Sequence, residues 1–386
     1  MPVSNFLAWD APLGAYERQA ADLLAAHAAG VPDALKLLHE NLPRFLDDTV
    51  AWLPRPITDE EIRSTALSID DARLALARCY SFLDWNALVD HVNEVAAADS
   101  PVHEFERASE AVITGDTDTL RSMLKANPAL ALARSARVTC HDPAVHGATL
   151  MHYLGANGIE GYRQRSPVNA VDVARVLFEA GAQADALAGM YGGQCATMSM
   201  LVSSTPPAEA GVQVPLVHVL IDHGANPNGA GEGAWRNPVM TALVFGFTDA
   251  AVALVDRGAE VDTIEMAAGL GRLADVTGFI QRSTRESRHR ALALAVISGQ
   301  IDVVNLLLAI GQDPNRFNPD GFHSHATPLH QASAAGNLPM VQLLVDRGAS
   351  MDVRDELWHS TPLGWAEYGG HSEVAEYLRA KGAPEA

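Results

Sequence analysis

A recurring frame of small and conformationally special residues constrains this chain more than any other feature. In the segment that begins Thr-Pro-Leu-His at Thr327, an alanine follows at Ala332, a glycine at Gly336 and a Gly-Ala pair at Gly348. Threonine can cap a helix through its hydroxyl, and proline suits the first helical position, where no N–H donor is needed. Glycine supplies positive φ for the turn between two helices and for the end of the second. The segment therefore predicts a helix-turn-helix unit.

Such a unit cannot bury its apolar faces alone, so it predicts neighbours built in the same way. The frame recurs, in whole or in part, from about eight starting residues: Glu106, Thr149, Thr197, Asn237, Asp262, Arg290, Thr327 and Thr361. In the second and third copies the closing Gly-Ala pair arrives late, at Gly181 and Gly224. These delays predict insertions at about 159–169 and 203–214.

The pattern resembles the ankyrin repeat, whose unit of about 33 residues has a Thr-Pro-Leu-His-x-Ala core. Residues 327–332 match that core in full. The segments that begin at Asp222 and Asp346 resemble the motif with which the family ends its second helix. The resemblance covers roughly residues 103–384. It implies an all-α ankyrin-repeat solenoid of about eight helix-turn-helix units with hairpin fingers. Most such arrays bind other proteins, so the resemblance implies binding and names no partner.

The region before the array, residues 1–102, reads as a helical capping region, and residues 103–386 read as the array. Thr58 followed by Glu61 is a capping-box start for a helix. Tyr80, Phe82 and Trp85 suit a cover over the exposed side of the first repeat, since solenoids need terminal caps. Residues 70–224 also resemble a group of bacterial ankyrin-repeat proteins, a resemblance that implies no activity.

Charge and composition narrow the classes of partner. A formal net charge of −20 argues against nucleic acid and against an anionic membrane surface. Neither a signal segment nor a run of about 18 apolar residues is recognisable, so a cytoplasmic location is expected. The three cysteines are widely spaced and are expected to be reduced thiols. No motif indicates a cofactor, and no histidine, cysteine and carboxylate spacing indicates a metal site.

The two insertions carry the sharpest candidate for a ligand or active site. His152 and Glu160 are the candidate catalytic acid and base, and Arg163 is a candidate anion clamp. The spacing of His152, Tyr153, Asn157 and Glu160 predicts that they share one helix face. The candidate ligand-binding residues are Tyr153, Asn157, Tyr162, Arg163, Gln164, Tyr191, Gln194 and Trp235. The structural alternative is an internal polar network that holds two long loops in place. For His152 the structural alternative is a pair of hydrogen bonds to neighbouring backbone segments, which the histidine at this position commonly forms in ankyrin repeats.

Two functions remain open from the sequence. The first is a cytoplasmic scaffold that holds a protein partner on a concave face lined by fingers bearing Tyr191, Trp235, Phe322 and Trp358. The alternative is a cofactor-free enzyme, an acid/base isomerase, lyase or hydrolase, or a binder of a small anionic or aromatic molecule. An enzyme predicts a closed pocket beneath the insertions. A scaffold predicts insertions whose polar groups satisfy one another.

Overall fold

The structure is a computed structural model that describes residues 5–384 except Ala51, Asn157, Gln164, Tyr191 and Ala234. The described chain is mostly helical, as the repeat frame predicts. It divides into two compact units. The first comprises Met1–Ala225 with Ala230–Gly233, and the second comprises Asn226–Gly229 with Ala234–Ala386. Each unit is described by itself.

The first unit begins with a group of helices that precede the repeats. They are α1 (Leu13–Ala28), α2 (Pro32–Asn41), η1 (Pro43–Phe45), α3 (Asp59–Ser64), α4 (Ile69–Cys79) and α5 (Trp85–Ala96). The predicted capping box at Thr58 and Glu61 is confirmed, and Ser68 and Asp71 form a second one at the start of α4. Apolar side chains from these helices form two clusters, one around Leu38 and one around Tyr80.

Three helix pairs complete the first unit. They are α6 (Pro101–Thr114) with α7 (Thr117–Ala126), α8 (Leu150–Leu154) with α9 (Ala170–Glu179), and α10 (Thr197–Leu201) with α12 (Gln213–Asp222). Shorter elements lie between them: η2 (Pro128–Leu132), η3 (Gly161–Arg163), α11 (Thr205–Glu209), and the antiparallel strands β1 (Leu187–Met190) and β2 (Gly193–Ala196). Residues 155–169 and 202–212 separate the paired helices of the second and third repeats. The division of the chain at residue 102 stays a proposal.

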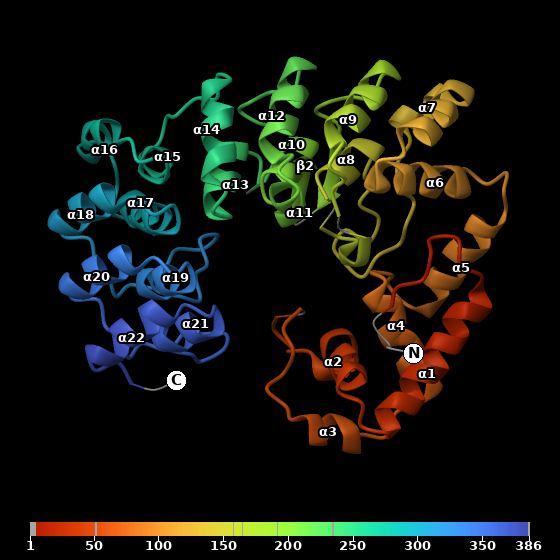
Figure 1. Ribbon diagram of the computed structural model, residues 1–386, viewed down its shortest axis with the longest axis horizontal. Helices are drawn as coiled ribbons and strands as arrows, with labels where there is room; N and C mark the ends of the chain where they lie inside the picture. The colour runs from red at the N-terminus through yellow and green to blue at the C-terminus, as the bar shows by residue number, and fades with distance from the viewer. Residues whose placement is uncertain are drawn as a thin grey trace. The chain divides into compact units, whose positions relative to one another are not determined.

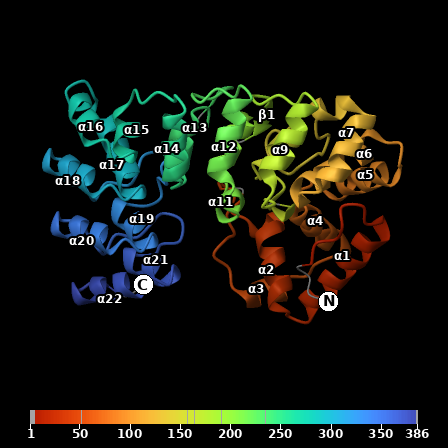
Figure 2. The ribbon, with the colours of Figure 1, turned by 45° about the horizontal axis from the view of Figure 1, so that its top comes forward.

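The second unit contains five further helix pairs, visible in Figures 1 and 2. They are α13 (Pro238–Val244) with α14 (Thr248–Asp256), α15 (Ile264–Gly269) with α16 (Leu273–Ile280), α17 (Arg285–Ile297) with α18 (Ile301–Ala309), α19 (Pro328–Ala334) with α20 (Leu338–Asp346), and α21 (Pro362–Tyr368) with α22 (Ser372–Ala380). One continuous apolar core runs from Ile264 to Leu378. Within the described residues the chain therefore has eight helix pairs, the number of repeats that the sequence predicts.

The histidine of the repeat core ties the unit that begins at Thr327 to the finger that follows it. His330 is fully buried, and its Nδ1 accepts a hydrogen bond from the backbone N–H of Thr327 at 3.2 Å. The other ring nitrogen, Nε2, therefore carries the proton and donates to the carbonyl of Ser360 at 3.1 Å. At the other end of the unit, Gly348 has φ of 87°, which lets Ala349 N–H close α20 on the carbonyl of Leu344.

No helix in the described part of the chain is both long and apolar enough to cross a membrane.

Replacing His330 by alanine removes both ties and leaves buried backbone groups without partners. We expect His330→Ala to lower the free energy of unfolding by about 2–4 kcal/mol, measured by urea denaturation. Gln331→Ala is the matched control because it changes a partly exposed neighbour on the same helix. Equal unfolding midpoints for the two variants would contradict the role given to His330.

Candidate functional site

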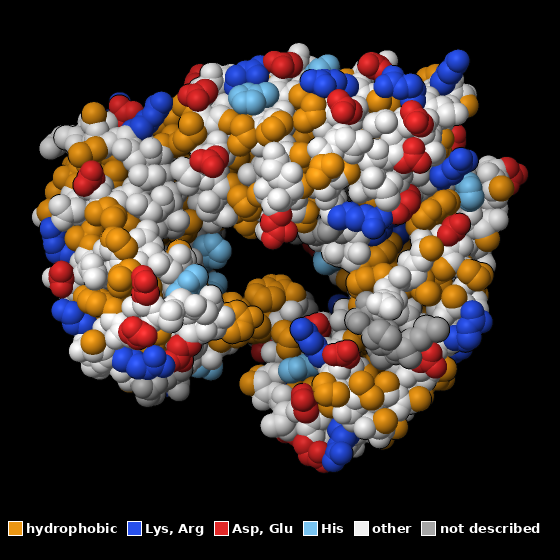
Figure 3. Space-filling view, viewed as in Figure 1, with side chains coloured by type: hydrophobic (Ala, Val, Ile, Leu, Met, Phe, Trp, Pro, Cys, Tyr) orange, Lys and Arg blue, Asp and Glu red, His pale blue; other side chains and the backbone are white. Residues whose placement is uncertain are grey.

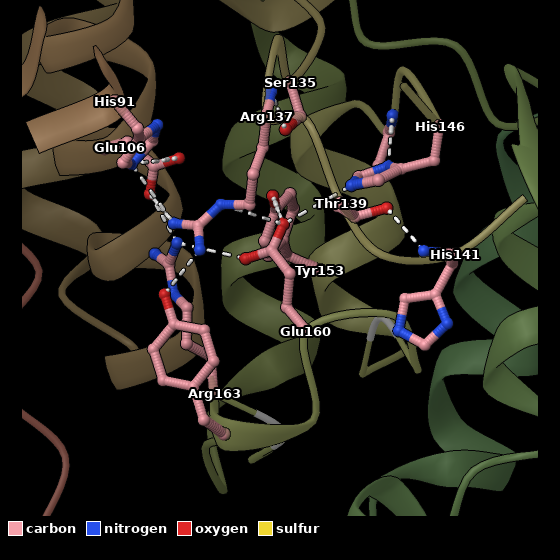
Figure 4. Close-up of polar contacts among 12 residues, drawn as sticks. His91, Glu106, Ser135, Arg137, Thr139, His141, His146, Tyr153, Glu160 and Arg163 are labelled. Carbon is pink, nitrogen blue, oxygen red and sulfur yellow. Dashed lines mark hydrogen bonds and ion pairs between the residues drawn. The ribbon is translucent and has the colours of Figure 1, made fainter. Parts of the chain in front are cut away.

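Four charged side chains of the first unit meet in its interior (Figure 4). Glu106 lies on α6, Arg137 lies in the connector between η2 and α8, and Glu160 and Arg163 belong to the insertion of the second repeat. None of the four residues is more than 7% exposed. We call Glu106, Arg137, Glu160 and Arg163 the buried quartet.

Each arginine of the quartet faces both carboxylates. Arg163 Nη1 donates to Glu106 Oε2 and, at 3.3 Å, to Glu160 Oε2. Arg137 Nη2 donates to Glu106 Oε2 at 3.4 Å, and Arg137 Nε lies 3.7 Å from Glu160 Oε1. Burying an isolated charge is very costly, and only close opposite charges offset that cost. The two positive and two negative charges balance, so the quartet can stay ionised inside the protein.

Further polar side chains complete the surroundings of the quartet. The Tyr153 hydroxyl donates to Glu160 Oε1 at 2.6 Å, and His146 Nε2 lies 3.5 Å from the same oxygen. On the other side, His91 Nε2 lies 3.3 Å from Arg137 Nη2 and accepts its hydrogen bond. Figure 4 shows these side chains converging from three segments of the first unit.

Burial and charge shift the pKa values in this cluster in opposite directions. Burial alone raises the pKa of Glu160, but attraction to Arg137, the contact with His146 and attraction to Arg163 outweigh it, so that pKa lies far below its usual range. The pKa of Glu106 is lowered by the same two arginines against the same effect of burial. For His91, burial first and then Arg137 lower the pKa to about 4. At neutral pH the carboxylates are therefore ionised and His91 is neutral.

The quartet also fastens the insertion to the helices that precede the repeats. Arg137 Nη1 donates to the Tyr162 hydroxyl at 2.9 Å, and its guanidinium lies 4.6 Å from the ring centroid of Phe82. The Tyr162 ring packs in turn on Tyr80 and Phe6, with centroids 5.2 and 5.3 Å apart. Two of the three aromatic residues predicted to cover the first repeat, Tyr80 and Phe82, thus pack around this cluster.

The structure gives His152 the same local role as His330. It is fully buried, its Nδ1 accepts from the N–H of Thr149 at 3.2 Å, and its Nε2 donates to the carbonyl of Cys195 at 3.1 Å. Burial lowers the pKa of His152 to about 4. Both ring nitrogens are occupied, so the catalytic role expected of His152 stays a hypothesis with no free nitrogen to support it.

The expected helical face of His152, Tyr153, Asn157 and Glu160 does not exist. Helix α8 ends at Leu154, because Ala156 adopts a positive φ of 55° that cannot continue a right-handed helix. Glu160 reaches Tyr153 from the insertion instead of from the next helical turn. The insertion does bring Tyr153 and Glu160 together, but the helical spacing from which this was predicted is absent.

The remaining predicted site residues are scattered or fall outside the description. Asn157, Gln164 and Tyr191 are outside the described residues. Gln194 lies on β2 with an exposed side chain, and Trp235 belongs to the second unit.

Sequence reasoning missed Glu106, Arg137, His91 and His146 as members of the cluster. Glu106 had been noted only as the start of a repeat frame. One signal was available for it: it lies beside an apolar stripe of α6 formed by Phe105, Ala108 and Val112. A carboxylate at such a position needs a buried partner. Arg137 lies in an irregular connector, where no spacing rule points to a partner.

Two polar side chains at the ends of the second insertion bond to carbonyls of α10. The Ser204 hydroxyl donates to the carbonyl of Met200 at 2.7 Å, and the Gln213 amide donates to that of Leu201 at 3.0 Å. Within the residues that the structure describes, no three histidine, cysteine or acidic side chains form a group that could hold a metal ion. The second insertion is thus fastened to α10, whereas among the described residues Arg163 Nε, Arg163 Nη2 and the Ser166 hydroxyl of the first insertion are buried without hydrogen-bond partners.

A second candidate surface lies in the second unit and consists of aromatic and histidine side chains. We call Trp235, Phe245, His323, His325, Trp358 and Trp365 the aromatic strip. The ring centroids of Trp235 and Phe245 lie 5.2 Å apart, with the rings tilted against each other. His323 Nε2 lies 3.3 Å from the carbonyl of Val244. Trp358 then lies 5.2 Å from His325. Figure 3 shows histidine and hydrophobic side chains gathered beside α19 and α21.

One buried carboxylate fixes the exposed end of this strip. Asp355 is fully buried, and its carboxylate accepts hydrogen bonds from the N–H groups of Leu357, Trp358 and Ser360 at 2.7–2.9 Å. It also accepts from the Trp365 indole at 3.1 Å. Trp358 remains 56% exposed on this rigid finger. Phe322, which was expected on the binding face, is instead only 8% exposed.

Removing one carboxylate from the quartet leaves two buried arginines with a single counter-charge. We expect Glu160→Gln to lower the free energy of unfolding by about 3 kcal/mol, measured by urea denaturation. Glu209→Gln is the control because Glu209 is an exposed glutamate of the same unit. A Glu160→Gln chain that is as stable as wild type, or more stable, would indicate a quartet strained for a ligand.

The neutral state of His91 predicts a dependence of stability on pH. Its folded pKa of about 4 lies below the ordinary 6.5, so the folded chain resists protonation. Stability is then complete above about pH 6.5 and falls as pH drops towards 4, with a loss of about 2 kcal/mol from this residue at pH 5. His91→Gln should shrink the stability difference between pH 7.5 and pH 5 by that amount. A difference as large as in wild type or in His359→Asn, which changes an exposed histidine, would refute this assignment.

Comparison with known proteins agrees with this architecture. The family model described as "Ankyrin repeats (3 copies)" matches residues 292–385. Human Cyclin-dependent kinase inhibitor 2A is 33% identical over 123 residues, which are 31% of this chain and 76% of that protein. Mouse Ankyrin repeat and SAM domain-containing protein 6 is 36% identical over 105 residues, which are 26% of this chain and only 11% of that relative. Mouse ARF GTPase-activating protein GIT2 is 35% identical over 95 residues, 25% of this chain and 13% of its own length. With eight helix pairs among the described residues and a histidine tie in two of them, the chain belongs to the ankyrin repeat family.

Proposed function

We propose that the chain is a cytoplasmic binding scaffold that holds a protein partner on the aromatic strip of its second unit. The observation that carries the proposal is the exposed Trp358 on a finger fixed by the buried Asp355 carboxylate. Tryptophan is prominent among the residues that dominate binding energy at protein interfaces. A side chain held in place before binding loses little conformational freedom when the partner arrives.

The strip offers a contact area that is spread over several repeats. Its members come from the fingers before α13, α19 and α21. Phe245 follows the last residue of α13, and Trp365 lies on α21. Phe245 is 43% exposed and Trp358 is 56% exposed. Solenoids use such extended surfaces, built from corresponding parts of successive repeats, to bind partners.

The printed names of the relatives agree with a protein partner in general terms. One is named as an inhibitor of a cyclin-dependent kinase and another as an activator of an ARF GTPase. Both names describe action on another protein. They support a protein as the class of partner proposed here. The particular kinase and GTPase are partners named for those relatives and are not assigned to this chain.

The alternative is a cofactor-free enzyme or a small-molecule binder beneath the insertions, and it has weaker support. The ring nitrogens of His152 are both occupied, and the Glu160 carboxylate is ionised, buried and hydrogen-bonded to Tyr153. A general base must reach the proton that it removes. For an acid/base reaction to occur here, the quartet would first have to separate, so the scaffold is the better reading of the geometry.

Replacing Trp358 by alanine should abolish most of the partner binding and leave the fold intact. We expect at least tenfold weaker binding, because truncation of a central tryptophan typically costs about 2 kcal/mol or more. The measurement is affinity capture from extracts of the source cells on immobilised wild type and variant, followed by titration of the captured protein.

Trp52→Ala is the matched control because Trp52 is an exposed tryptophan, at 66%, in the helical region before the repeats. It should retain the captured protein. Retention of the same protein by Trp358→Ala, at unchanged affinity, would show that the strip is not the binding surface.

A further inference from the structure

We infer that the end of the aromatic strip around Trp358 recognises a positively charged protein segment that carries arginine or lysine. The inference rests on the proposed function and names the chemistry of the partner. Three features carry it: exposed carboxylates on two fingers, nearby arginines that are already engaged, and the exposed face of Trp358.

Two acidic side chains stand exposed on the fingers that contribute to this end of the strip. Asp320 lies on the finger before α19, and Glu356 lies on the finger before α21. The backbone N–H of Glu356 donates to the carbonyl of His325 at 2.9 Å, which places Glu356 beside the strip. Among the described residues, neither carboxylate forms an ion pair. Both are therefore available to a cationic partner.

The arginines of the same two fingers do not neutralise these carboxylates. Arg316 pairs with Glu286 at 2.8 Å, and Arg354 donates to the carbonyl of His359 at 2.6 Å. His325 adds no positive charge, because burial and the neighbouring His323 lower its pKa. The exposed Arg236 lies next to Trp235, at the other end of the strip. Arg354 keeps its positive charge when bonded to a carbonyl, so among the described residues the two carboxylates Asp320 and Glu356 face one unpaired cation and these fingers carry a net negative charge.

An aromatic ring beside carboxylates suits a cation in two ways at once. The face of a tryptophan ring attracts an ammonium or guanidinium group, and the aliphatic stem of lysine or arginine packs on the same ring. Asp320 and Glu356 supply ionic partners for further cations of the segment. The net charge of −20 adds long-range attraction for a basic partner and repulsion for an acidic one. An apolar or acidic segment would leave the two carboxylates unpaired.

The test uses three fluorescein-labelled peptides of ten residues, built from Gly-Arg, Gly-Ser or Gly-Glu repeats. Each is titrated by fluorescence anisotropy into the full chain at 50 and 300 mM NaCl. We expect the Gly-Arg peptide to bind, to bind more weakly at high salt, and to bind more tightly than the other two.

The charge-reversal variant Asp320→Lys/Glu356→Lys isolates the finger carboxylates from the overall charge. Its control is Asp346→Lys/Glu376→Lys, which makes the same change in net charge at exposed positions of α20 and α22. We expect the finger variant to weaken Gly-Arg binding about tenfold or more and the control to weaken it by less than about threefold. Trp358→Ala should weaken it as well.

Equal weakening by both double variants would show that the peptide is attracted only by net charge, and the inference would be wrong. Absence of Gly-Arg binding, or tighter binding of Gly-Ser or Gly-Glu, would also overturn it. These outcomes leave the proposed function standing if Trp358→Ala still abolishes capture of the protein partner. If Trp358→Ala leaves that capture unchanged, the proposed function itself fails.

Discussion

The mutual burial of apolar helix faces between neighbouring repeats is the interaction on which this structure depends. A single helix pair is too small to bury its own apolar face, so stability is shared along the array. The core that runs without interruption from Ile264 to Leu378 shows this directly. In two repeats a buried histidine adds a polar tie, from His330 to the carbonyl of Ser360 and from His152 to that of Cys195. The helices can approach closely only where the side chains are small. The frame of alanine and glycine positions is therefore recognisable in the sequence.

The first unit adds a different kind of fastening, because its irregular segments are too polar to join that core. The insertion of the second repeat and the connector before it meet α6 through the buried quartet. Charges so deeply buried are tolerated only because Arg137 and Arg163 balance Glu106 and Glu160. The same arginine, Arg137, reaches Tyr162 and Phe82, so the quartet also holds the preceding helices against the repeats. Its ion pairs account for the burial of Glu160 and Arg163 in the insertion.

The repeat fold could be predicted from sequence patterns within single repeats, whereas the buried quartet could be predicted only in part. Each repeat is defined within about 33 residues, and caps such as Thr58 with Glu61 act over three. The quartet joins residues 31 and 57 positions apart through irregular backbone, where no periodicity applies. Arg163 was identified from the insertion itself, whereas Glu160 was grouped with His152 on the wrong premise that α8 continues past Leu154. Trp358 was expected on a finger, but the role of Asp355 escaped prediction, because it depends on hydrogen bonds from the finger backbone to a buried carboxylate.

Function follows from the contrast between the two units: one uses its charged cluster internally, and the other leaves ordered aromatic side chains exposed. The most direct measurement is hydrogen–deuterium exchange of the full chain with and without its captured protein partner. The account predicts that binding slows exchange in the fingers at 315–326 and 354–360 and leaves the insertion at 159–169 unchanged. Slower exchange confined to that insertion would place the binding site at the buried quartet and contradict the account.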